Sequence, residues 1–235
     1  MKKKINFKRF IPAAIIIILM IIATLTGVGD YLSMDQIRDH RIVLKAFVSV
    51  HPFLAPLTFM SIYTVATALS IPGAVFLTII GGFLFPQPLA TIFVVISATL
   101  GAIVIFLAAK TALHDFLKRQ AGNALTKMQQ GFQDNAVNYL LFLRLVPIFP
   151  FWLVNLAPAF FSVSLFTFTW TTFLGIIPGS FVFAQAGVGL GAIFDAGDTL
   201  SIHTILNRDV KIALVALGLF ALIPAIIKKL RKRRQ

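Results

Sequence analysis

The chain contains an uncharged run of 58 residues, from Pro52 to Ala109, that no single helix can accommodate. About 20 apolar residues suffice to cross a hydrocarbon core of about 30 Å, so this run is long enough for more than one pass. Proline and glycine interrupt it at Pro72-Gly73, Gly81-Gly82, Pro86 and Pro88. Irregular backbone is tolerated at membrane depth only where protein buries it or water reaches it. We therefore predict a re-entrant helical hairpin over residues 52–86, followed by a spanning helix over residues 89–109.

A second uncharged run of 50 residues, from Leu145 to Phe194, has the same character. Prolines divide it at positions 147, 150, 158 and 178. The same reasoning predicts a second re-entrant hairpin over residues 136–161 and a second spanning helix over residues 164–190.

The composition places the whole chain in a membrane. Hydrophobic residues make up 58% of the 235 residues and charged residues 12%, whereas a soluble domain is about one quarter charged. Cysteine is absent, which excludes disulfides, thiolate metal sites and cysteine nucleophiles. We expect one all-α polytopic membrane domain.

The basic residues concentrate in two tails, at residues 1–9 and 228–235. Such clusters suit the anionic lipid headgroups of a cytoplasmic leaflet better than nucleic acid, for which we expect no binding. Both termini are therefore predicted to be cytoplasmic, which requires an even number of crossings.

The remaining segments complete the predicted topology. Apolar runs at residues 10–29 and 212–227 are the first and last spanning helices, and residues 30–51 form an external loop of zero formal charge. Residues 110–135 are basic and cytoplasmic, with an interfacial amphipathic helix over residues 113–130. The result is four spanning helices and two hairpins that enter from opposite faces, an inverted repeat typical of transporters. Six ordinary spanning helices with proline kinks satisfy the same parity.

Arg144 is the charge that this topology does not explain. It precedes Pro147 by three residues, inside membrane-grade sequence, where an ionisable group costs roughly 3 kcal/mol on insertion scales and more in simulations. An intramembrane charge is by default a functional-site hypothesis. The alternative role is structural, because Arg144 can also extend to the cytoplasmic interface or cap carbonyls that the prolines leave unpaired.

Two motifs carry a resemblance to a known family. Residues 70–85 read Ser-Ile-Pro-Gly-Ala-Val-Phe-Leu-Thr-Ile-Ile-Gly-Gly-Phe-Leu-Phe, and residues 144–155 form an Arg-x-x-Pro-x-x-Pro-Phe-x-x-x-Asn string. Together with Gly175-Ile-Ile-Pro178-Gly179, they resemble the DedA superfamily of VTT-domain, or SNARE-associated Golgi, proteins over residues 50–190. The resemblance implies opposed re-entrant hairpins and a lipid translocase or scramblase. Its substrates would be phospholipid or polyprenyl-phosphate, moved between leaflets of a membrane, here expected to be a bacterial plasma membrane.

The chain departs from the pattern of DedA members in its charges. It has no Glu, no acidic residue between Asp39 and Asp115, and Pro150 at the position where those members carry a second arginine. It resembles the Golgi-protein branch more closely, and proton coupling is disfavoured. Because all eight Asp map to predicted loops or interfaces, we expect the counter-ion of Arg144 to be a lipid phosphate.

A lipid phosphate needs a polar path and a fixed positive charge. A guanidinium grips phosphate oxygens with two parallel hydrogen bonds, and backbone N–H groups at helix starts add partial positive charge. The predicted lipid-phosphate site comprises Arg144, Pro72, Gly73, Pro147, Pro150, Phe151, Asn155 and Gln185.

No motif for catalysis, ATP hydrolysis or metal binding occurs in the sequence. We therefore expect no catalytic residues, no cofactor, no metal and no enzyme activity. Two other functions stay open, an ion-coupled secondary transporter of a small solute and a non-transporting membrane assembly factor. A homo-oligomer is also compatible with the sequence.

Overall fold

The computed structural model describes residue 18 and residues 34–71, 73–120, 135–145, 151–161 and 163–196. All regular elements in these ranges are α-helices, as predicted. They are α2 (Met34–Val50), α3 (Leu54–Ala68), α4 (Ala74–Leu84), α5 (Leu89–Gln120), α7 (Ala136–Leu145), α8 (Phe151–Phe160) and α9 (Leu165–Ala196). The predicted spanning helices at 10–29 and 212–227 and the basic tails lie outside the described residues, apart from Ile18.

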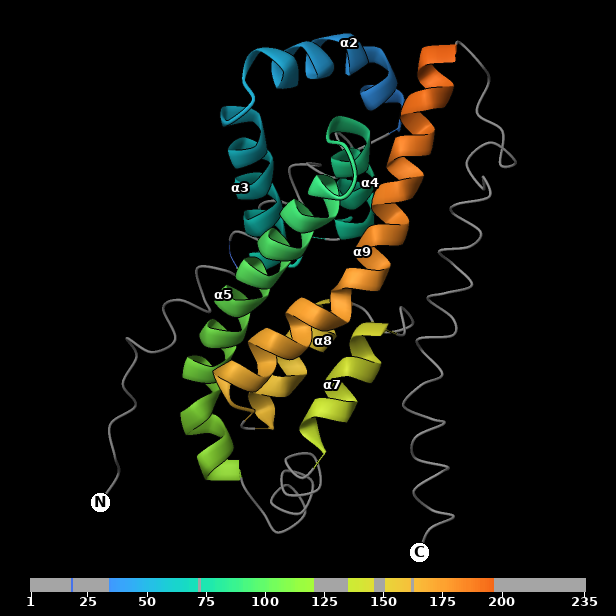
Figure 1. Cartoon of the computed structure of the whole chain (residues 1–235). Helices are drawn as coiled ribbons and strands as arrows, with labels where there is room; N and C mark the ends of the chain where they lie inside the picture. Colours follow the sequence, from blue (N-terminus) through green and yellow to red (C-terminus); the bar gives the residue numbers. More distant parts are fainter. Residues whose placement is uncertain are drawn as a thin grey trace, which may run out of the picture.

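Two long helices form the frame of the molecule. Within α5 and α9, residues Leu89–Thr111 and Leu165–Gly191 are long and apolar enough to cross a membrane. A third candidate arises if α2 and α3, which are bent by 118° relative to each other, are counted as one broken span. The helix α9 changes direction near its middle (Figure 1). Pro178 lies inside α9 and removes one backbone donor, which explains a bend in this part of the helix.

The helix α5 extends beyond its predicted apolar span. The predicted span over residues 89–109 corresponds to the apolar part of α5, Leu89–Thr111, but the helix then continues without a break to Gln120, where a separate interfacial helix over residues 113–130 was predicted. The reason is that no proline or glycine lies between Gly101 and Gln120, so nothing interrupts the backbone hydrogen bonds.

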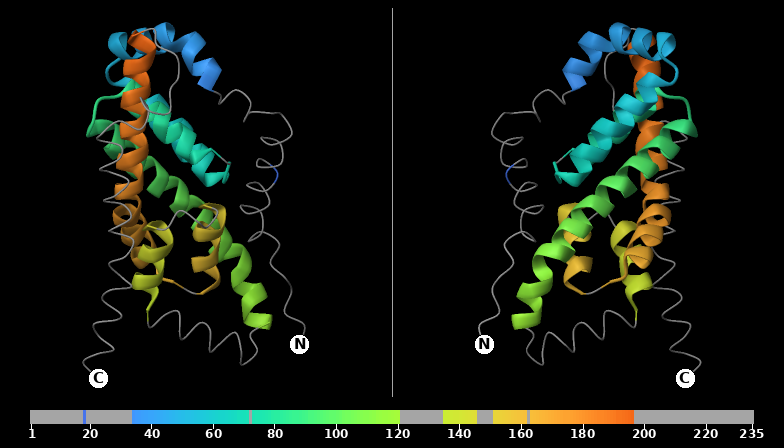
Figure 2. Two further views of the ribbon diagram at one scale, coloured as in Figure 1. Left: turned by 90° about the vertical axis from the view of Figure 1, so that its right-hand side faces the viewer. Right: turned by 90° about the vertical axis from the view of Figure 1, so that its left-hand side faces the viewer.

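Two helical hairpins pack on this frame and open toward opposite ends of the molecule (Figures 1 and 2). The first hairpin consists of α3 and α4 and their connection, residues 69–73, and its open end lies beside α2. The second hairpin consists of α7 and α8, and its open end lies at the far end of α5. The connection between α7 and α8 lies outside the described residues.

Glycines let the first hairpin approach the frame backbone to backbone. A Cβ on Gly82 of α4 would overlap the carbonyl oxygen of Ala184 in α9, and a Cβ on Gly187 would overlap the carbonyl oxygen of Ile79. On the other side, a Cβ on Gly101 of α5 would lie 2.5 Å from the carbonyl oxygen of Thr64 in α3. Close approach through glycine is how apolar helices associate where lipid removes the hydrophobic driving force.

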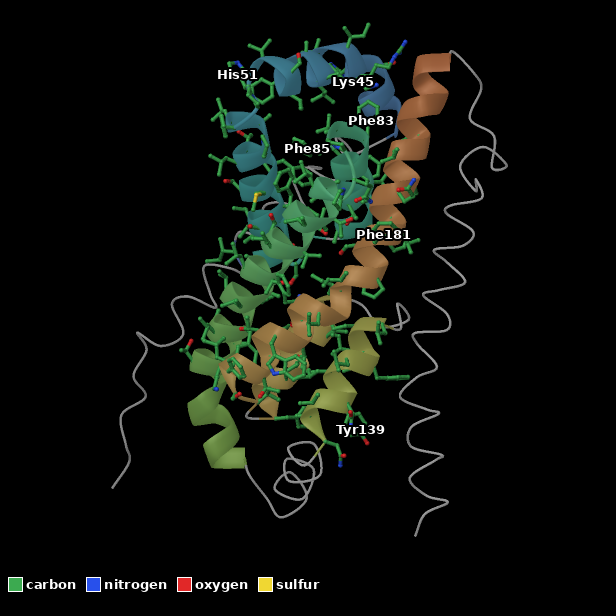
Figure 3. All side chains as sticks on the ribbon, viewed as in Figure 1. Lys45, His51, Phe83, Phe85, Tyr139 and Phe181 are labelled. Atoms are coloured by element: carbon green, nitrogen blue, oxygen red, sulfur yellow. The ribbon has the colours of Figure 1, made fainter. Side chains whose placement is uncertain are left out.

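The region predicted as an external loop, residues 30–51, instead contains a helix, α2. Its charged residues suggested a loop, but it has no proline or glycine and carries apolar residues four apart. Val48 packs on the apolar cluster of the first hairpin, and the ammonium nitrogen of Lys45 lies 5.3 Å from the ring centroid of Phe83 (Figure 3). The helix α2 therefore covers the open end of the first hairpin.

Candidate functional site

Arg144 lies in the last turn of α7, next to α9. A Cβ on Gly175 of α9 would lie 2.7 Å from Cβ of Arg144, which is closer than side chains normally approach. The absence of a side chain at Gly175 therefore leaves space for the side chain of Arg144 between α7 and α9. This gives a physical role to a glycine that the sequence motif contains.

Two side chains of α9 hold the guanidinium of Arg144. Its Nη2 donates a hydrogen bond of 2.9 Å to Oγ1 of Thr172. Its Cζ lies 5.4 Å from the ring centroid of Phe168, within the range of a cation–π interaction. Thr172 and Phe168 are both buried, so the guanidinium contacts side chains that are themselves closely packed.

The ring of Phe168 continues into a stack that reaches a second cation. Phe168 lies parallel to Phe106 of α5, with centroids 4.3 Å apart and planes 13° apart. The ammonium nitrogen of Lys110 lies 5.5 Å from the Phe106 centroid and donates a hydrogen bond of 3.1 Å to the carbonyl of Val163. Arg144 and Lys110 thus lie at the two ends of one aromatic stack that joins α5, α7 and α9.

The structure describes five of the eight predicted site residues, including Arg144. Gly73 precedes α4 with φ 125°, a conformation that only glycine adopts readily, and Asn155 is buried in α8. Gln185 lies half-buried in α9 and Phe151 is the first residue of α8, while Pro72, Pro147 and Pro150 lie outside the described residues.

The located residues do not form a single cluster with Arg144. Gln185 is ten residues beyond Gly175 on α9, which places it about 15 Å farther along the helix. Asn155 makes no hydrogen bond with Arg144. The described surroundings of Arg144 are instead the face of α9 formed by Phe168, Thr172 and Gly175.

Four residues around Arg144 were not predicted from the sequence, namely Thr172, Phe168, Phe106 and Lys110. A signal for part of the set exists, because Phe168, Thr172 and Gly175 are spaced i, i+4 and i+7, which places them on one helix face. A hydroxyl on such a face can accept a hydrogen bond from a cation that lies among apolar helices. The contribution of α5 had no comparable signal, since it depends on how α5 and α9 cross.

The described residues offer no metal site, because no three His, Cys, Asp or Glu side chains among them lie close enough to share an ion. The chemistry of the site is that of a fixed guanidinium beside aromatic rings and hydroxyls. Such a group binds oxyanions, and carboxylates and phosphates above others.

Known proteins resemble the chain over most of its length. Residues 71–189 match the model of the VTT domain. Transmembrane protein 41B of Xenopus tropicalis is 30% identical over 205 residues, covering 86% of this chain and 71% of that protein. A transmembrane protein 41 homolog of Caenorhabditis elegans is 32% identical over 204 residues, covering 86% of this chain and 76% of that protein. Human transmembrane protein 41B is 30% identical, covering 86% and 68%.

No solved structure matches the chain. The family match includes both motifs that carried the resemblance, the Pro-Gly segment at the first hairpin and the Arg-Pro-Pro-Phe-Asn string at the second. The chain therefore belongs to the VTT-domain family of integral membrane proteins, which includes the DedA and SNARE-associated Golgi proteins.

Proposed function

We propose that this protein is a lipid scramblase, which moves phospholipid or polyprenyl-phosphate between leaflets without ATP. The observation that carries the proposal is Arg144, a permanent cation fixed by Thr172 and Phe168 within a bundle of apolar helices. A planar guanidinium binds a phosphate with two parallel hydrogen bonds, which a lysine cannot reproduce. An intramembrane cation held in this way suits the transient binding of a lipid headgroup.

In this proposal the two hairpins are re-entrant. The helices α4, α7 and α8 have 11, 10 and 10 residues, which corresponds to about 15–17 Å at 1.5 Å per residue. That is about half of a hydrocarbon core of about 30 Å. Helices of this length support hairpins that enter and leave on one side, in preference to kinked helices that each cross the membrane.

The proposed orientation follows from the sequence. Both basic tails lie in the cytoplasm, the first hairpin enters from outside and the second from the cytoplasm of a bacterial cell. Membrane phospholipids are the partners, with anionic lipids at the tails. The proposed activity is transport without covalent chemistry, so the protein is not an enzyme.

Reconstitution tests this function directly. Purified protein is placed in liposomes that contain a fluorescent phospholipid in both leaflets, and dithionite added outside reports how fast inner-leaflet lipid becomes accessible. We expect the wild-type protein to make all label accessible without ATP or a proton gradient. Arg144→Gln should slow exchange at least tenfold, and Arg144→Lys should restore little of it.

Arg41→Gln is the matched control, because Arg41 lies on α2 at the other end of the molecule. It should leave the exchange rate unchanged. Wild-type liposomes that protect half of the label, like protein-free liposomes, would refute the scramblase proposal. Equal rates for wild type and Arg144→Gln would refute the role of Arg144.

A further inference from the structure

Two buried polar side chains near the ends of the hairpins have no hydrogen-bond partner among the described residues. They are Thr67, in the last turn of α3, and Asn155, one turn from the start of α8. Thr67 is 2% exposed and Asn155 is 0% exposed. The hydroxyl of Ser70, in the connection that follows α3, is also buried without a partner.

Other buried hydroxyls of the bundle behave differently. Thr78, Ser97, Thr99 and Thr171 each donate a hydrogen bond to the carbonyl four residues earlier in their own helix. This local bond is the ordinary way to satisfy a hydroxyl inside an apolar helix. Thr67 lies in a helix too but does not make it, so its hydroxyl is directed elsewhere.

Thr67 and Asn155 belong to opposite hairpins, and both hairpins pack on α5 at neighbouring positions. A Cβ on Gly101 would lie 2.5 Å from Cβ of Thr67. The next residue, Ala102, belongs to one apolar cluster with Leu156 and Ala159 of α8. The closed end of the first hairpin points toward α8 in both orientations (Figures 1 and 2).

A buried polar group without a partner destabilises a fold, and such a group needs an explanation such as an unseen ligand or a functional role. We propose that Thr67 and Asn155, with Ser70, form a neutral hydrogen-bonding site between the hairpins. The site would bind uncharged donor and acceptor groups, which are water or the ester and hydroxyl groups of a lipid. Its hydroxyls and amide offer both donors and acceptors, whereas Arg144 offers donors only.

This inference rests on the proposed function and assigns two parts of the lipid to two different sites. Arg144 would hold the phosphate, while the neutral site would solvate the polar but uncharged part of the lipid at the middle of the bilayer. A lipid that crosses an apolar core loses its hydration unless protein groups replace it. Strong charge at this position would trap the headgroup, so hydroxyls and an amide suit a passage better than a second cation.

The first test compares the same substitution at two buried threonines of the first hairpin. Thr67→Val removes a hydroxyl without a partner, and we expect an unchanged or higher Tm together with lipid exchange at least fivefold slower. Thr78→Val removes a hydroxyl that bonds to Tyr63 and to the carbonyl of Ala74, so the Tm should fall while the folded protein exchanges lipid within twofold of wild type. Asn155→Leu should behave like Thr67→Val.

The second test does not depend on lipid exchange, and uses the absence of cysteine from the natural chain. Thr67→Cys and Asn155→Cys are treated with a charged, water-soluble methanethiosulfonate, and Ala98→Cys and Ala102→Cys serve as equally buried controls on α5. We expect the first pair to react at least tenfold faster. If added phospholipid slows this reaction, lipid groups occupy the site; if it does not, water does.

The outcomes distinguish a failure of the neutral site from a failure of the scramblase proposal. Fast labelling in a protein that fails to exchange lipid supports the neutral site and refutes the scramblase. Labelling as slow as at Ala102 in both detergent and liposomes overturns the site. Unchanged exchange in Thr67→Val and Asn155→Leu, in a wild-type background that exchanges lipid, overturns its part in transport.

Discussion

The two hairpins have similar shapes but are attached to the frame in different ways. The first hairpin meets α5 and α9 backbone to backbone, through Gly101, Gly82 and Gly187. The second hairpin meets α9 at Gly175, where the two atoms nearest to a Cβ on this glycine belong to the side chain of Arg144. Glycine thus serves packing in one hairpin and makes room for a charged group in the other.

The polar groups of the hairpins differ in the same sense. The described side chains of α3 and α4 include hydroxyls and no charge, whereas α7 carries Arg144. A hydroxyl can satisfy itself within its own helix, but a guanidinium needs partners from neighbouring helices. The first hairpin therefore presents neutral polar groups on a closely packed backbone, whereas the second carries a cation that contacts α9.

The largest effect is expected where the first hairpin packs against α9. Gly187→Val places a branched side chain where the carbonyl of Ile79 lies, and overpacking of this kind costs about 1–3 kcal/mol or more because backbone cannot move aside cheaply. We expect a Tm lower by more than ten degrees, or no folded protein, in thermal unfolding in detergent.

Gly179→Ala is the control on the same helix. Nothing lies within 4 Å of a Cβ at this position, so the Tm should stay the same or rise slightly. If Gly187→Val unfolds at the same temperature as Gly179→Ala, the first hairpin is not locked to α9 by glycine.

The next largest effect is expected at the hydrogen bond that holds the guanidinium of Arg144. Thr172→Val removes the acceptor of the 2.9 Å bond from Arg144, and hydrogen bonds of charged groups contribute about 1.5–3 kcal/mol. We expect lipid exchange about tenfold slower, measured in proteoliposomes. Thr171→Val provides the comparison, because its buried hydroxyl bonds only to carbonyls of α9 in the described structure. Equal loss in both variants would argue against a specific role for Thr172.

A smaller effect is expected from the aromatic ring beneath the guanidinium. Phe168→Leu keeps an apolar side chain but removes a cation–π interaction of about 0.5–2 kcal/mol. Lipid exchange should slow about threefold. The double variant with Thr172→Val should be slowed by less than the product of the two single effects, because both residues act on Arg144. Fully multiplicative effects would show that the two residues act independently.

The smallest effect is expected at the far end of the stack. Lys110→Gln removes a cation that contacts Phe106 and the carbonyl of Val163 but not Arg144. We expect the Tm to fall by a few degrees while exchange stays within twofold of wild type. A tenfold loss of exchange would mean that Lys110 itself contacts the lipid.

The break between α3 and α4 could be predicted because its cause is local. Proline and glycine act on the residues beside them, and helices α3 and α4 end and begin around the Pro72-Gly73 break. The helix α2 and the continuation of α5 to Gln120 were not predicted, because neither segment contains a local break. Charged residues suggest loops between apolar runs, but a charged segment without proline or glycine can continue as helix.

The candidate site could be predicted only in part. The charge of Arg144 stands out in apolar sequence, but its partner Thr172 is 28 residues away and becomes its neighbour only when α7 packs on α9. Thr67 carries no signal at all, because a threonine in an apolar helix normally bonds to its own backbone. Its missing partner is a property of the fold.

The central claim is that Arg144 acts on the phosphate of a lipid. It is tested most directly with two fluorescent lipids that share acyl chains and label, one with a phosphate headgroup and one with a neutral sugar headgroup, in proteoliposomes of wild type and Arg144→Gln. We predict that Arg144→Gln slows the phospholipid at least tenfold and leaves the rate of the glycolipid within twofold of wild type. Equal slowing of both lipids, or of neither, would contradict the claim.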